Sequence, residues 1–161
     1  MNKVFLGIGS NLGDRSANLK KAVSKINEII GRVAKSSSVY EAEPWGFEAE
    51  EQFYNMVVET ETLLSPSGVL GAILMIEAEL GRLRTEKQYS SRNIDIDILF
   101  YNDLVMNEEA LIVPHPHLHE RKFVLVPLYE IAPEFVHPVM NMTIADLLGS
   151  CDDKSDVRKI I

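Results

Sequence analysis

Alternation between apolar and acidic residues in the segment 92–100 constrains the fold more than any other feature of the chain. The segment reads Arg-Asn-Ile-Asp-Ile-Asp-Ile-Leu-Phe. A period of two residues is typical of a β-strand, because successive strand side chains point to opposite faces. The isoleucines are therefore expected on one face, with Asp95 and Asp97 side by side on the other.

Two neighbouring carboxylates on one strand face predict a bound cation. Without a cation, their repulsion would drive a proton onto one of the pair. Magnesium suits this position, because it prefers hard oxygen ligands and usually takes only one or two carboxylates together with substrate phosphates. The alternative is an edge strand whose acidic face is solvated, since charged residues are common on sheet edges.

The residues just before this strand form a basic segment, 82–92, in an otherwise acidic protein. It contains Arg82, Arg84 and Arg92, whereas the whole chain has a formal net charge of −8. The acidic total argues against nonspecific nucleic-acid binding, which requires a basic surface. It does not argue against binding a single nucleotide, because the local field matters more than the total charge. Anion-binding donors are thus expected beside the aspartates.

Length and cysteine content narrow the class of protein. The 161 residues suit one domain that covers 1–161. Cys151 is the only cysteine, which excludes an intrachain disulfide and fits a reducing compartment. The first residues lack a signal-peptide pattern, and no apolar run is long enough to cross a bilayer. We therefore expect a cytoplasmic monomer that does not contact membranes.

The hydrophobic pattern predicts a succession of strands and helices. Strands are expected at 3–8, 33–40, 53–63 and 94–100. Helices are expected at 19–30, 66–80, 123–131 and 143–148. Ser65 followed by Pro66 is typical of a helix N-cap with proline at the first helical position. The polar last ten residues are expected to fray.

This order indicates an α+β fold with a ferredoxin-like βαββαβ core. The sheet would be mainly antiparallel, with helices packed on it and C-terminal additions beyond the core. A doubly wound parallel sheet fits less well, because the second and third strands follow each other without a helix between them.

Gly7, Gly9 and Gly13 invite comparison with a dinucleotide-binding fingerprint. Their spacing is G-x-G-x-x-x-G, so the third glycine comes one residue late, and no Walker lysine follows. The pattern favours a tight strand-to-helix turn that needs positive φ angles. Glycines also allow the backbone to approach a ligand closely, so that role stays open.

Four further residues are candidates for ligand contact. Asn55 shares a strand face with Phe53, and an amide beside an aromatic ring suits a flat heterocycle that is both stacked and hydrogen-bonded. Glu77 lies on the helix that leads into the basic segment, where a binding role and a solvated role are both open. His115 lies between two prolines and fits a phosphate donor better than a zinc ligand, because suitably spaced cysteine and carboxylate partners are missing.

Several motifs between about residue 3 and about residue 138 belong together. They are Gly7-x-Gly9-Ser10-Asn11-Leu12-Gly13, Pro44-x-Gly46, Gln52-x-x-Asn55, Glu77, Gly81-Arg82-x-Arg84, Arg92-x-x-Asp95-x-Asp97-Ile98, Val113-Pro114-His115-Pro116, Arg121-x-Phe123 and Glu130-Ile131-Ala132-Pro133-Glu134. In this combination the chain resembles the 6-hydroxymethyl-7,8-dihydropterin pyrophosphokinase family.

The resemblance implies a reaction and a set of ligands. Pyrophosphate would pass from ATP to the hydroxymethyl group of 6-hydroxymethyl-7,8-dihydropterin, giving AMP and the pterin diphosphate in folate biosynthesis. Two Mg²⁺ ions would bind with ATP at Asp95 and Asp97. By the same resemblance, the remaining residues would be catalytic (Arg82 and Arg92), ATP-binding (Glu77, Arg84, Ile98, His115 and Arg121) and pterin-binding (Pro44, Phe53, Asn55 and Phe123).

Two other classes of function remain as alternatives. A nucleotidyltransferase can also present Asp-x-Asp on a strand, but it would usually need a third carboxylate nearby. A noncatalytic nucleotide-binding or metal-binding module would need neither Asn55 beside a stacking ring nor so many arginines. Release of AMP that depends on the pterin alcohol distinguishes the kinase from both.

Overall fold

The computed structural model describes residues 1–42, 52–81 and 93–160. Its main sheet is antiparallel and consists of β1 (Asn2–Ser10), β2 (Arg32–Ser36), β3 (Tyr40–Ala42), β4 (Phe53–Thr62), β5 (Asp95–Tyr101) and β8 (Val157–Lys159). A short hairpin consists of β6 (Met106–Asn107) and β7 (Ile112–Val113). The helices are α1 (Arg15–Ile29), α2 (Pro66–Glu79), α3 (Lys122–Ile131) and α4 (Ile144–Gly149), with a 3₁₀ turn η1 (Leu118–Glu120).

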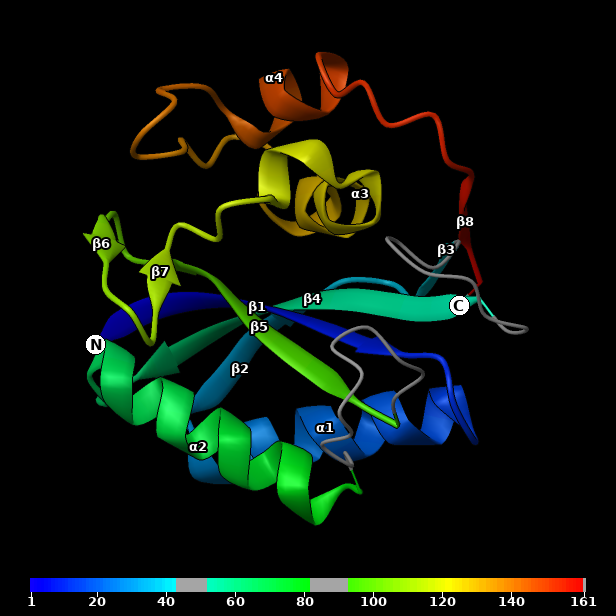
Figure 1. Ribbon diagram of the computed structural model, residues 1–161, viewed down its shortest axis with the longest axis vertical. Helices are drawn as coiled ribbons and strands as arrows, with labels where there is room; N and C mark the ends of the chain where they lie inside the picture. The colour runs from blue at the N-terminus through cyan, green and yellow to red at the C-terminus, as the bar shows by residue number, and fades with distance from the viewer. Residues whose placement is uncertain (43–51, 82–92, 161) are drawn as a thin grey trace.

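The helices cover the sheet from both sides. The helices α1 and α2 lie on one face, whereas α3 and α4 lie on the other (Figure 1). The strand order is β5-β1-β4-β3-β8, and β2 pairs with β4 beside β3. The predicted ferredoxin-like core with C-terminal additions is therefore confirmed. No helix in the described ranges combines the length and apolar character needed to cross a bilayer.

The strand predicted at 33–40 is interrupted in the structure. The chain leaves β2 after Ser36 and enters β3 only at Tyr40. At the break, the Ser37 hydroxyl accepts a hydrogen bond from the Val57 amide at 2.9 Å. Serine side chains that bond to nearby backbone groups compete with a regular ladder, which explains why one predicted strand became two.

The starts of α2 and α4 follow the capping rules. The Ser65 hydroxyl accepts from the Gly68 amide at 3.1 Å, and Pro66 is the first residue of α2. The Thr143 hydroxyl accepts from the Asp146 amide at the start of α4. Each cap satisfies an amide that has no partner within its helix. The N-cap predicted at Ser65 is confirmed, and Thr143 caps α4 in the same way.

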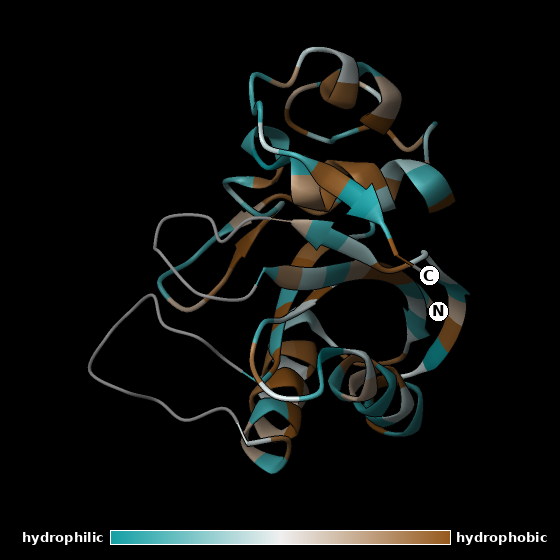
Figure 2. Cartoon of the chain, turned by 90° about the vertical axis from the view of Figure 1, so that its right-hand side faces the viewer, coloured by the Kyte–Doolittle hydropathy of each residue, from teal (hydrophilic) through white to brown (hydrophobic). Residues whose placement is uncertain are grey.

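An apolar layer lies on each face of the sheet, between the sheet and the helices that cover it (Figure 2). Ile94, Ile96 and Ile98 are buried in the layer beneath α1 and α2, as the alternating pattern predicts. Phe100 continues the same alternation in the sequence, but it lies in the layer beneath α3 and α4. A register shift between Phe5 and Leu6 on the paired strand β1 accounts for this, because one extra residue on β5 reverses the side-chain direction.

The polar C-terminal segment is paired rather than frayed, so that expectation was wrong. The strand β8 adds to β3 in antiparallel register, with Arg158 opposite Glu41. The Arg158 Nη2 and Glu41 Oε1 atoms are 2.6 Å apart. Backbone pairing together with this ion pair orders a segment whose composition alone predicts disorder.

Glu130 ties α3 to the chain around β3. Its carboxylate accepts hydrogen bonds from the Ser38 amide and hydroxyl, each at 2.9 Å, and from the Tyr40 hydroxyl at 2.6 Å. Burial raises the pKa of Glu130, but these hydrogen bonds outweigh burial and hold the pKa below its ordinary value of 4.5. Burial and the same carboxylate raise the pKa of Tyr40 to about 12. The end of α3 is thereby fixed over the sheet.

Candidate functional site

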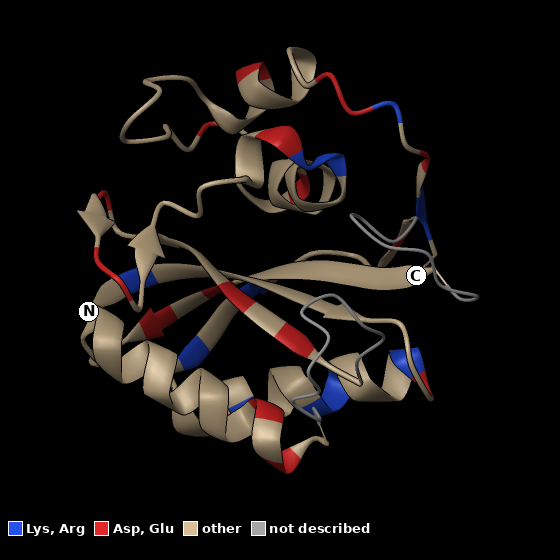
Figure 3. Cartoon of the chain, in the orientation of Figure 1, with Lys and Arg blue, Asp and Glu red and all other residues tan. Residues whose placement is uncertain are grey.

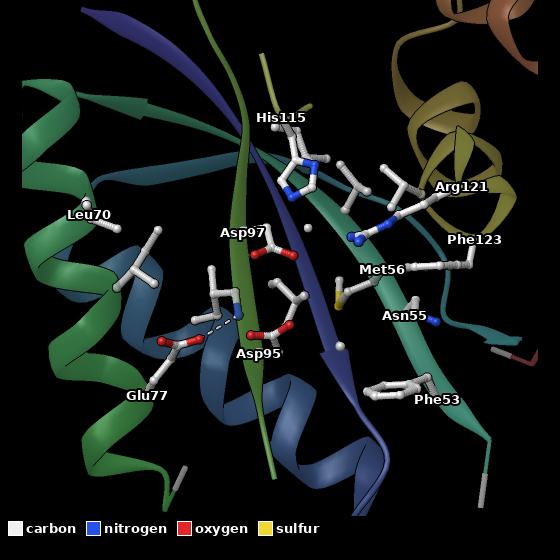
Figure 4. A pocket seen from close by; sticks show the side chains of 18 of the residues that line it. Phe53, Asn55, Met56, Leu70, Glu77, Asp95, Asp97, His115, Arg121 and Phe123 are labelled. Carbon is white, nitrogen blue, oxygen red and sulfur yellow. Dashed lines mark hydrogen bonds between the residues drawn. The ribbon is translucent and has the colours of Figure 1, made fainter. Parts of the chain in front are cut away.

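A cavity of about 350 Å³ opens between α2, the sheet and α3 (Figure 4). Three strands of the sheet contribute to it, together with the loop after β7 and the start of α3. The described residues that line it are Gly7, Ile8, Gly9, Phe53, Asn55, Met56, Val57, Leu70, Ile73, Leu74, Glu77, Asp95, Ile96, Asp97, Leu99, His115, Arg121, Phe123 and Val124.

The two aspartates of β5 lie in a row with residues of β1 and β4. Asp95 is opposite Gly9, and Gly9 is in turn opposite Asn55. Asp97 is opposite Gly7. Acidic residues of β5 are visible along the strand in Figure 3, and Figure 4 shows both carboxylates pointing into the cavity. The sheet thus places two carboxylates and one amide on the same floor.

Gly7 and Gly9 are strand residues, so their interpretation as part of a strand-to-helix turn was wrong. Among the glycines of that motif, only Gly13 has a positive φ, of 72°. A Cβ atom on Gly9 would lie 2.9 Å from Asn55 Oδ1. Glycine is therefore needed here for space and not for conformation. The predicted strand ended at residue 8, but the alternate spacing of Gly7 and Gly9 was a signal that the strand continues through Gly9.

The amide of Asn55 is positioned for a ligand. Only 8% of the residue is exposed, and in the part of the chain that the structure describes, its Nδ2 atom has no hydrogen-bond partner. Burial of an amide donor without an acceptor is unfavourable. Phe53 and Phe123 lie on the same side of the cavity as Asn55 (Figure 4). This corner therefore suits a flat ligand with an acceptor on its edge.

Glu77 is buried, with 3% exposed, so the solvated alternative does not hold. Its Oε2 atom accepts a hydrogen bond from the Ile96 amide at 2.9 Å (Figure 4). Because β5 lies at the end of the strand order, the Ile96 amide is on the outer edge of the sheet, where no neighbouring strand supplies a hydrogen-bond acceptor in the described residues. Glu77 thus fixes α2 against the strand that carries the aspartates.

His115 is a neutral hydrogen-bond donor in this site. Burial, followed by the nearby positive charge of Arg121, lowers the pKa of His115 from 6.5 to about 4. Its Nδ1 atom accepts from the His117 amide at 3.2 Å, which assigns the proton of the neutral ring to Nε2. The Arg121 guanidinium carbon lies 5.8 Å from the centre of the Phe123 ring. A donor and a fixed positive charge therefore adjoin the carboxylates.

The cavity unites most of the residues that the sequence singled out. Eight of them line it, namely Phe53, Asn55, Glu77, Asp95, Asp97, His115, Arg121 and Phe123. Ile98 does not, because it is buried in the apolar layer beneath the helices. Pro44, Arg82, Arg84 and Arg92 lie outside the described residues. The ligand roles of all these residues remain predictions.

Sequence reasoning missed the apolar wall that α2 contributes beside the predicted Glu77. Leu70, Ile73, Leu74 and Glu77 line the cavity together. Their spacing of three, one and three residues places them on one helix face, and this was the available signal. In the described ranges, no three histidine, cysteine or acidic side chains gather into a complete metal-binding cluster. Any ion at the aspartates would need ligands beyond the described histidine, cysteine and acidic side chains.

The chain is similar to known proteins over most of its length. The family model described as 7,8-dihydro-6-hydroxymethylpterin-pyrophosphokinase (HPPK) matches residues 5–133. A protein of Aquifex aeolicus named 2-amino-4-hydroxy-6-hydroxymethyldihydropteridine pyrophosphokinase is 44% identical over 139 residues, which cover 86% of either chain. A protein of the same name from Methylorubrum extorquens is 42% identical over 153 residues, or 94% of this chain and 95% of the relative.

Solved structures show the same fold. A crystal structure of wild-type Plasmodium falciparum HPPK-DHPS superposes with a TM-score of 0.75 at 18% identity and covers 92% of this chain. This chain spans 44% of that longer chain. At such low identity the likeness concerns the fold alone.

Proposed function

The chain belongs to the 7,8-dihydro-6-hydroxymethylpterin-pyrophosphokinase family, and we propose that it transfers pyrophosphate from ATP to 6-hydroxymethyl-7,8-dihydropterin. The products are AMP and the pterin diphosphate, and the reaction is a step of folate biosynthesis. The hydroxymethyl oxygen bonds to the β-phosphorus, and the bond from that phosphorus to the oxygen bridging to the α-phosphate breaks. Positioning and charge neutralisation supply most of the rate enhancement in such transfers.

One observation carries the proposal beyond family membership. A pair of carboxylates and a buried amide donor share one cavity, and they are separated only by the glycine floor of β1. A phosphate-bearing substrate with its cations fits the acidic side, whereas a flat heterocycle fits the amide side. A transfer between two such substrates requires this adjacency, because the reacting atoms must meet within one cavity.

Asp95 and Asp97 fit magnesium. Both offer hard oxygen ligands on the same strand face, and the glycines opposite them leave room above the sheet. The two carboxylates would hold two ions together with the phosphates of ATP. When bound, such ions neutralise phosphate charge and make a ligated hydroxyl more acidic.

The nucleotide side of the proposal rests on α2 and on the start of α3. The apolar wall of α2 would cover the adenine, and Glu77 would contact the ribose. His115 Nε2 and Arg121 would donate hydrogen bonds to phosphate oxygens. The proposed contact of Ile98 with the nucleotide would have to come from its backbone, since its side chain is buried among the helices. On sequence grounds, we also assign Arg82, Arg84 and Arg92 to the phosphates. Of these three, Arg82 and Arg92 would be the catalytic residues.

The pterin side rests on the corner formed by β4 and α3. Phe53 and Phe123 would stack against the pterin ring, and Asn55 Nδ2 would donate to an acceptor on its edge. Pro44 is assigned to the same subsite on sequence grounds. We propose that the enzyme works as a monomer, because the described side chains that line the cavity all come from one chain. The single cysteine supports a cytoplasmic location.

Formation of AMP tests the proposal. The protein is incubated with ATP, magnesium and 6-hydroxymethyl-7,8-dihydropterin, and AMP and pyrophosphate are separated chromatographically. Formation of AMP that depends on the pterin is expected. In the matched control, 6-methyl-7,8-dihydropterin replaces the substrate, and no AMP should form because the accepting hydroxyl is absent. Release of free pyrophosphate would indicate a nucleotidyltransferase, and no turnover at all would indicate a binding module.

A further inference from the structure

Arg15 forms a group of contacts on the face of the sheet opposite Phe53 and Asn55. It is the first residue of α1, which covers that face (Figure 1). Its Nη1 atom donates to the Gln52 carbonyl oxygen at 2.7 Å and lies 3.6 Å from Glu41 Oε2. Its guanidinium carbon lies 3.9 Å from the centre of the Tyr54 ring. One side chain therefore contacts β3, β4 and the residue that precedes β4.

These partners surround the residues proposed to bind the pterin. Tyr54 lies between Phe53 and Asn55 in β4, and Gln52 directly precedes Phe53. Because strand side chains alternate, Tyr54 points to the α1 face while its two neighbours point to the cavity. A contact that holds the Tyr54 ring and the Gln52 carbonyl also sets the backbone from which Phe53 and Asn55 project.

The contacts of Arg15 extend across the edge of the sheet. Glu41 is opposite Tyr54 on β4 and opposite Arg158 on β8, so three strands share one row. The Glu41 carboxylate forms ion pairs with both Arg158 and Arg15, and its Oε1 atom lies 2.6 Å from Arg158 Nη2. Both Arg15 and Glu41 are largely buried as side chains, at 22% and 16% exposure. A buried pair of this kind is screened less by solvent than a surface pair.

We propose that Arg15 is a positioning residue for the pterin half of the site, acting through Gln52 and Tyr54 from the opposite face of the sheet. The inference rests on the proposed function, because it assigns the β4 corner to the pterin. Arg15 is not among the described residues that line the cavity. Its planar guanidinium both stacks on the ring and donates to the carbonyl, which the ammonium of lysine does not reproduce.

Binding to each substrate separately tests this role. Calorimetry measures the affinity for 6-hydroxymethylpterin in the presence of an ATP analogue with a methylene group between the α- and β-phosphorus atoms. It also measures the affinity for the analogue alone. For Arg15→Ala we expect about a tenfold loss of pterin affinity, equivalent to about 1.4 kcal/mol. Affinity for the analogue should change less than about twofold, since the nucleotide side of the cavity lies along α2 and β5.

Arg32→Ala is the matched control. Arg32 also forms an ion pair with a glutamate of β4, at 2.9 Å to Glu61, but at the end of the strand far from the cavity. Its replacement should leave both affinities unchanged. A similar loss of pterin affinity in Arg32→Ala would overturn the inference, because any weakening of the sheet would then have the same effect.

Arg15→Lys keeps the experiment informative if Arg15→Ala does not fold. Lysine retains the charge that pairs with Glu41 but not the planar contact with Tyr54. Pterin affinity should therefore still fall about threefold. In steady-state kinetics, KM for the pterin should rise and KM for ATP should stay unchanged. Unchanged pterin affinity in both variants, or equal losses for both ligands, would overturn the inference. Failure of the proposed function is distinct, because then the wild-type protein itself would form no AMP from ATP and the pterin.

Discussion

Replacement of Gly9 by alanine should weaken pterin binding selectively, because it adds one methyl group to the floor of the cavity. An ideal Cβ at this position would lie 2.9 Å from Asn55 Oδ1 and 3.6 Å from Phe53 Cδ1. The second distance is an ordinary contact, whereas the first is too short for carbon and oxygen. The Asn55 amide must therefore turn or withdraw, and its Nδ2 donor moves with it.

The size of the effect follows from the hydrogen bond that is lost. A buried donor left without its acceptor costs about 1–3 kcal/mol, which corresponds to about 5- to 150-fold in pterin affinity. The fold itself should be affected little, because alanine is favoured over glycine within a strand by about 0.5–1 kcal/mol and this offsets part of the local strain. ATP binding should stay close to wild type, since the methyl group faces Asn55.

Calorimetry with 6-hydroxymethylpterin and with the methylene analogue of ATP measures both affinities. Gly71→Ala in α2 is the control, because a Cβ there meets no heavy atom within 4 Å. This variant should gain up to about 1 kcal/mol of helix stability and keep both affinities. Wild-type pterin affinity in Gly9→Ala, or an equal loss for both ligands, would refute the reasoning that Gly9 makes room for the Asn55 amide.

Three further outcomes are expected. Asp95→Ala and Asp97→Ala should each abolish AMP formation without lowering the melting temperature, because both carboxylates face the cavity; activity within about tenfold of wild type at saturating magnesium would contradict the two-ion site. Phe123→Ala should weaken pterin binding by on the order of 1 kcal/mol or more and leave ATP binding unchanged in calorimetry, and equal losses would mark Phe123 as a core residue. Glu130→Gln should remove part of the acid-dependent loss of stability. Because the folded pKa of Glu130 is below 4.5, its ionised form stabilises the protein above that value, and this contribution is lost as the pH falls through the folded pKa. Parallel melting temperatures for wild type and Glu130→Gln from about pH 6 down to about pH 3 would contradict that assignment.

Local sequence patterns determined the helices, the three long strands β1, β4 and β5, and most of the site residues. Period-two alternation placed Asp95 and Asp97 on one strand face, and that face lines the cavity. The Ser65 cap and the following proline located the start of α2. Such features depend on residues close together in the chain, where the geometry of a strand or a helix turn decides which side chains share a face. The family resemblance rested on the same short motifs.

The tertiary structure alone decided which distant residues meet. Strand pairing placed Gly9 between Asp95 and Asn55. It thereby showed that Gly7 and Gly9 of the glycine motif form the floor of the cavity. A register shift moved Phe100 to the other apolar layer. Arg15 gave no local signal, because its partners lie 26 to 39 positions away along the chain. Cross-strand register and contacts of this range arise from the packing of the whole sheet, which no window of neighbouring residues encodes.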